Sequence, residues 1–138
     1  MLKIFNQYKD EIIKEFGRVP MYDSQIKKFG REHISNFGGV YPHDKFNPSD
    51  NRYYVINTSN SKGPGYHWVG IVTTDANMYL FDSFHRDPDS IFNEIEKFQE
   101  DRQVVVTKIK NPVQKDTPED SNICGQLSMA WLQCLKNY

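Results

Sequence analysis

The chain lacks any long apolar run, any strong charge imbalance and any abundance of cysteine. Its 138 residues carry a formal net charge of −1, so composition gives no reason to expect nucleic acid or an anionic membrane as a partner. No apolar stretch approaches the roughly 20 residues that a membrane span needs, and residues 1–17 lack the apolar core of a signal peptide. These absences predict an intracellular protein that does not cross a membrane.

Only two cysteines occur, Cys124 and Cys134, and their spacing argues against a disulfide. They are ten residues apart on one predicted helix, which separates them by about 15 Å along its axis. Bridged Cα atoms lie within about 7 Å of each other. Zinc is not expected either, because the chain has no Cys-x-x-Cys pair and no paired Cys/His spacing. We therefore expect Cys124 to be a free thiol in a reducing compartment.

What the chain does contain is enough apolar sequence for a single domain over residues 1–138. Apolar residues at helical spacing predict a helix over 2–16, and residues 24–39 suggest one or two short helical turns broken by glycines. After residue 50 the sequence pattern predicts strands over 52–58, 67–73 and 78–82, then a helix over 88–99 and a last strand over 103–110. The fold class is therefore α+β, with a small mixed sheet packed against helices.

The stretch SNICGQLSMAWLQCL (121–135) predicts a helix that is apolar almost all round, as expected for a helix buried inside a domain. Ser121 and Asn122 are suitable capping residues, which puts Cys124 in the first turn. Unpaired N–H groups and the positive end of the helix dipole favour a thiolate there. Cys124 therefore fits a nucleophile, although a buried structural thiol fits the same pattern equally well.

His67 opens one predicted strand and Asp82 closes the next, with a turn centred on residues 74–77 between them. The two residues then fall opposite each other or one diagonal step apart, on the same face of the hairpin. Their Cβ atoms would lie roughly 5 Å or about 7 Å apart. A hydrogen bond at that separation orients the imidazole and leaves its other nitrogen free as a base. Taken alone, a polar pair at the surface is the commoner explanation.

The order of several features narrows the choice. The chain contains, in this order, His67-Trp68, Asp82, Gln114 and Cys124-Gly125. This order resembles the adenain (adenovirus endopeptidase) family of cysteine proteases, whose clan includes the ubiquitin-like-protein proteases. The likeness covers most of the chain after about residue 35 and is carried by FGGVYPHDKF, YVINTSNSKGPGYHWVGI, YLFDSF and NICGQLSMAWL. Because fourteen residues follow Cys124 where adenain continues further, it implies a reduced version of that fold, as a small DNA virus or virophage would encode.

The resemblance implies a peptide hydrolase with a cysteine nucleophile. Cys124 would attack the carbonyl, His67 would act as acid and base, and Asp82 would orient His67. The Gln114 amide would form the oxyanion hole with the backbone N–H of Cys124. Gln114 lies ten residues before Cys124, a few more than the family pattern has, so KDTPEDSNI looks like a small insertion.

Two other glutamines compete for the oxyanion role. Gln126 lies inside the predicted helix and Gln103 precedes a whole strand, which leaves Gln114 as the better candidate. The resemblance also implies that Trp68, Gly65 and Gly125 border a narrow cleft for small residues, often glycine, before the cleaved bond. The mechanism needs no metal and no organic cofactor.

The leading expectation is a monomeric viral maturation protease that cuts capsid or core precursors in the infected cell and travels in the virion. A deconjugase of ubiquitin or a related modifier would use the same mechanism, since a Gly-Gly terminus fits the same cleft, but this short chain offers little docking surface. A binding module without activity is the third alternative, against which the intact nucleophile, base and acid argue.

Adenain is stimulated by a viral peptide, and the resemblance leaves open whether this protein also needs an activating peptide. The basic segments KIKNPVQK and IKKFGRE form only local positive patches, and we expect them to be solvent-exposed surfaces that do not bind DNA.

Overall fold

The computed structural model describes residues 2–42, 46, 52–57, 68–74, 77–81, 105–109 and 123–137. The helices in these ranges are α1 (Leu2–Phe16), α2 (Asp23–His33) and α4 (Cys124–Asn137). The strands are β1 (Phe37–Pro42), β2 (Tyr53–Asn57), β3 (Trp68–Thr73), β4 (Asn77–Phe81) and β5 (Val105–Ile109). None of the helices in the described ranges has the length and apolar character needed to cross a membrane.

The five strands form one mixed sheet in the order β1-β2-β3-β4-β5. β3 runs antiparallel to both of its neighbours, whereas the outer pairs β1–β2 and β4–β5 are parallel. In the β3–β4 hairpin Gly70 pairs with Phe81 and Thr73 pairs with Met78. This register is the one that the turn predicted at residues 74–77 requires. The α+β class with a small mixed sheet is confirmed.

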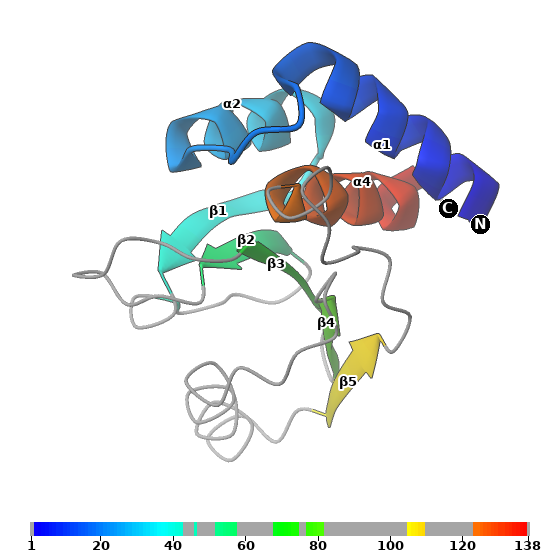
Figure 1. The fold of residues 1–138 in the computed structure, drawn as a ribbon. Coiled ribbons are helices and arrows are strands. Elements are labelled where there is room, and N and C mark those ends of the chain that lie inside the picture. The colour runs from blue at the N-terminus through cyan, green and yellow to red at the C-terminus, as the bar shows by residue number, and fades with distance from the viewer. Residues whose placement is uncertain are drawn as a thin grey trace.

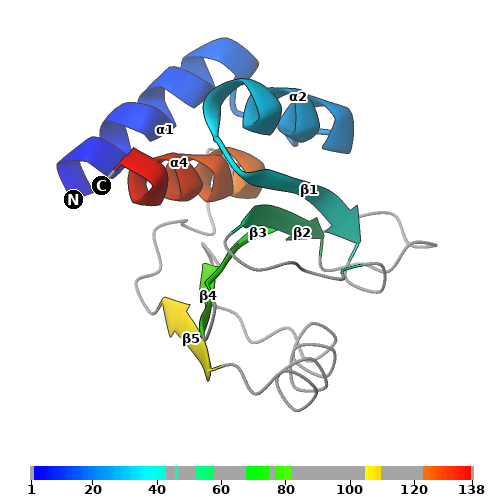
Figure 2. The same ribbon diagram turned by 180° about the vertical axis from the view of Figure 1, so that it is seen from behind.

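The helices lie together on one side of the sheet, with α4 between the sheet and the other two helices (Figures 1 and 2). α4 packs against α1 on one side and against β3 on the other. Every residue from Ile123 to Cys134 is buried, which confirms the central helix predicted from its apolar composition. α1 has the predicted bounds and ends at Phe16, and the φ of 83° at Gly17 suits a glycine that directly follows a helix.

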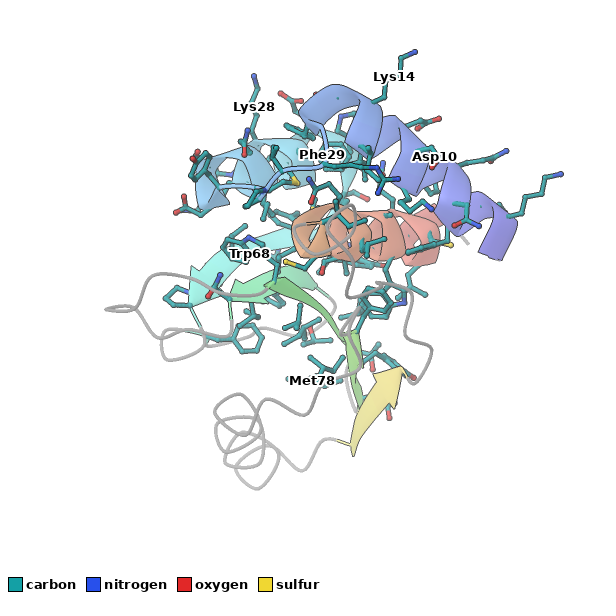
Figure 3. All side chains as sticks on the ribbon, viewed as in Figure 1. Asp10, Lys14, Lys28, Phe29, Trp68 and Met78 are labelled. Carbon is teal, nitrogen blue, oxygen red and sulfur yellow. The ribbon has the colours of Figure 1, made fainter. Side chains whose placement is uncertain are left out.

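Apolar side chains cover both faces of the sheet, as the alternation along β3 shows. Val72 belongs to the larger cluster beneath the helices, whereas Val69 and Ile71 belong to a second cluster on the opposite face. Figure 3 shows Phe29 within the helical layer and Met78 on the far side of the sheet. A sheet that is apolar on both faces explains why its strands read as near-continuous hydrophobic runs in the sequence.

Residues 24–39 differ from the expectation of short turns broken by glycines. They form most of the continuous helix α2 and the beginning of strand β1. Gly30 is buried inside α2, where a Cβ atom would lie 2.5 Å from the Phe37 ring. Gly38 lies under the Tyr54 ring, with which any Cβ atom would collide. Both glycines therefore permit close packing, and neither ends its element.

Candidate active site

Cys124 is the first residue of α4, in the first turn as the sequence predicts. A backbone hydrogen bond from Leu127 N–H to the Ile123 carbonyl, 2.9 Å long, opens the helix. The sulfur therefore lies where the helix N–H groups have no partner inside the helix and where its dipole is positive. Cys124 is 8% exposed, and it forms no disulfide with Cys134.

The Cys124 sulfur contacts the main chain of β3. The backbone N–H of Trp68, the first residue of that strand, donates to Cys124 Sγ over 3.4 Å. The Trp68 carbonyl accepts a hydrogen bond of 3.2 Å from the hydroxyl of Ser128, one turn further along α4. Both main-chain polar groups of Trp68 are thus bound by side chains of α4. Figure 3 shows Trp68 beside the N-terminal end of that helix.

The indole ring of Trp68 is held against the connection between α1 and α2. Its Nε1–H donates to the Met21 carbonyl over 3.0 Å. A Cβ atom on Gly125 would lie 3.3 Å from Trp68 Cδ1 and 3.2 Å from Met21 Cβ. The glycine that follows Cys124 therefore leaves room for Trp68 and Met21 over the first turn of α4. This close approach gives a structural reason for a Cys-Gly pair at the start of an apolar helix.

Gln126 joins the same connection to α4 from a position that is 0% exposed. Its Nε2 donates to the carbonyl of Gly17 over 2.9 Å and to the carbonyl of Val19 over 2.7 Å. The Met21 carbonyl accepts the bond from the Trp68 ring. Every second carbonyl of the α1–α2 connection, from Gly17 to Met21, is therefore hydrogen-bonded beside the first turn of α4. The amide of Gln126 is therefore committed to holding the fold together.

We expect Gln126→Leu to lower the free energy of unfolding by about 1–3 kcal/mol, because it leaves two carbonyls without their buried donor. Urea unfolding followed by circular dichroism measures the change. Gln133→Leu is the matched control, since both glutamines lie buried on α4 and each has an Oε1 atom without a hydrogen-bond partner among the described residues. Replacing Gln133 should change stability little. Equal losses in the two variants would contradict a specific contribution from the bonds of Gln126.

Three of the seven predicted site residues are described, and the structure brings them together: Cys124, Trp68 and Gly125. The other four, His67, Asp82, Gln114 and Gly65, lie outside the described residues. In the sequence, His67 directly precedes the first residue of β3, and Asp82 directly follows the last residue of β4. Within the part of the chain that is described, no three His, Cys, Asp or Glu side chains are grouped to hold a metal ion.

Sequence reasoning did not identify Met21 or Ser128 as neighbours of the site. Met21 is buried against Gly125, and Ser128 bonds to Trp68 across 60 positions of sequence. A signal for Ser128 was present, because a hydroxyl inside an otherwise apolar helix must find a hydrogen-bond partner when it is buried. Nothing in the composition around Met21 marks its carbonyl as the partner of an indole.

No family model matches the chain, and no curated protein matches it in sequence.

Proposed function

We propose that the protein is a cysteine endopeptidase that cuts peptide bonds after small residues, with glycine preferred. The observation that carries the proposal is the 3.4 Å contact between the Trp68 N–H and Cys124 Sγ. It joins the first residue of the strand that follows His67 to the first residue of the central helix. A thiol protease needs its base and its nucleophile next to each other, and this contact supports that arrangement.

The local environment of Cys124 suits a nucleophile better than a packing thiol. Its sulfur accepts a backbone hydrogen bond and stands at a helix N-terminus, where the N–H groups have no partner inside the helix. Cys134 provides the contrast within the same helix. It is 1% exposed and part of the apolar core, and burial raises the pKa of its thiol. Of the two thiols, Cys124 is therefore the one placed for chemistry.

In the proposed mechanism the Cys124 thiolate attacks the carbonyl carbon of the scissile bond and forms a tetrahedral intermediate. The Gln114 side-chain amide and the Cys124 N–H stabilise the negative oxygen. The intermediate collapses to an acyl-enzyme as His67 protonates the leaving amine. His67 then removes a proton from a water molecule that attacks the acyl group, and the thiolate leaves again. Asp82 orients His67 and stabilises its protonated form.

The proposed preference for small residues comes from the resemblance to adenain, and the residues beside Cys124 support it. The half-buried Trp68 ring lies over Gly125, and we propose that Trp68, Gly125 and Gly65 form the narrow wall of the cleft. A substrate with glycine before the cleaved bond would pass this wall without a side chain to accommodate. Because the chain resembles adenain, we propose a viral capsid or core precursor as its substrate. The proposed enzyme acts as a monomer and needs no cofactor.

Fluorogenic peptides test the proposal. A peptide that ends in Gly-Gly before the reporter group should be cleaved, whereas a matched peptide that ends in Leu-Leu should not. Pretreatment with iodoacetamide should stop the reaction. A folded ubiquitin bearing the same reporter distinguishes the deconjugase alternative, which requires much faster release from ubiquitin than from the peptide. No release from any of these substrates, or from capsid precursors followed by mass spectrometry, would refute proteolytic activity.

A further inference from the structure

Ser128 is a buried polar residue on α4, whose other buried residues are mostly apolar. It is 0% exposed and lies four residues after Cys124 on α4, so the two side chains share one face of the helix. A buried hydroxyl is costly unless it forms a hydrogen bond. Ser128 forms one with the Trp68 carbonyl, 3.2 Å long, and the N–H of the same residue bonds to the Cys124 sulfur.

We propose that Ser128 is a positioning residue for the nucleophile: by holding the Trp68 carbonyl, it keeps the Trp68 N–H directed at the Cys124 sulfur. The inference deepens the proposed function and rests on it. A hydrogen bond to an ionised acceptor is roughly twice as strong as one between neutral groups. A correctly directed N–H therefore binds the sulfur most strongly when the sulfur reacts as an anion.

Two hydrogen bonds to α4 fix the orientation of the Trp68 main chain, which a single bond would leave free to rotate. In an extended strand the N–H and the carbonyl of one residue point to the same side, and α4 offers one partner to each. Cys124 and Ser128 are about 6 Å apart along the helix axis, so Trp68 cannot slide along α4 without breaking a bond. Without the Ser128 hydroxyl the strand would stay in place, since Trp68 also pairs with Asn57 and bonds to Met21 through its ring. The N–H, however, would be free to turn away from the sulfur.

Ser128→Ala tests this role in the whole 138-residue chain with iodoacetamide, a probe that needs no proteolysis. We expect alkylation of Cys124 at pH 7, followed by mass spectrometry, to slow about tenfold, which corresponds to about 1.4 kcal/mol. With the Gly-Gly peptide, kcat should fall by a similar factor while KM stays unchanged. Cys134, buried on the same helix, serves as an internal reporter of opening, and its alkylation should not accelerate.

Thr73→Val is the matched control at the opposite end of β3. Thr73 is 4% exposed, and its hydroxyl bonds to the main chain of Arg52, so the variant also removes a buried hydroxyl bonded to main chain. It should leave Cys124 alkylation unchanged. The proposal is overturned if Ser128→Ala reacts at the wild-type rate or faster, or if Thr73→Val slows Cys124 equally. If Ser128→Ala slows alkylation while the wild type cleaves no peptide, the positioning role stands and the protease proposal fails.

Discussion

A Cys124→Ala protein should fold normally and release no product from the Gly-Gly peptide, so that its rate equals the uncatalysed background. The reason is that the sulfur supplies the attacking electron pair and forms the acyl-enzyme, for which a methyl group offers no substitute. Its packing role is small by comparison. The loss of one sulfur and of its bond from Trp68 should cost at most about 1–2 kcal/mol of stability. The measurement combines the steady-state rate with a urea unfolding curve.

Cys134→Ala is the control for this prediction, because it removes the same atom from the same helix. Cys134 lies in the core, and the raised pKa of its thiol disfavours the thiolate. The variant should keep wild-type kcat and lose stability on the order of 1 kcal/mol through the gap it leaves. A Cys134→Ala protein without activity, beside an active Cys124→Ala protein, would remove the basis of the proposed mechanism.

The second large effect concerns the base. His67→Ala should lower kcat/KM for the Gly-Gly peptide by roughly 10²–10⁴-fold, the usual range for loss of a general acid–base group. The fall should appear in kcat, because the leaving amine must be protonated before the acyl-enzyme can form. Circular dichroism should show an unchanged fold. A His67→Ala enzyme with wild-type turnover would mean that another group carries the proton.

Asp82→Asn should behave differently from His67→Ala and keep measurable activity. An asparagine still accepts a hydrogen bond and orients the imidazole, but it does not stabilise the protonated ring. Orientation of the base also matters less for a thiolate than for a serine hydroxyl, because the thiolate already carries the negative charge. A rate that matches wild type over the full pH range would assign the orienting role to a different residue.

Local patterns predicted the elements that are determined by their own sequence. The helix over 2–16 has the predicted bounds because its apolar spacing and Gly17 act within the same few turns. The β3–β4 register was predictable because a short turn fixes the pairing of the strands it joins. The first-turn position of Cys124 followed in the same way from the boundary of an apolar helix.

Two kinds of contact could not be predicted from the sequence. One is the close packing that a glycine allows because it has no side chain, and the other is a hydrogen bond formed by the main chain. Gly30 and Gly38 were interpreted as breaks because the rings that fill the space above them come from other elements. Gly125 gave no sign that Trp68 and Met21 approach it closely. The bond from the Trp68 N–H to sulfur involves a backbone group that every non-proline residue has, so no residue type could have predicted it.

The placement of α4 also has a consequence for how the protein is made. The helix packs against α1, which precedes it by more than 100 residues, and against β3. Such separations raise the contact order, and a high contact order slows folding. During synthesis the first two helices and the sheet leave the ribosome before α4 does. The Cys124 sulfur and the Trp68 amide therefore meet only after α4 has left the ribosome, and the proposed active site is incomplete until then.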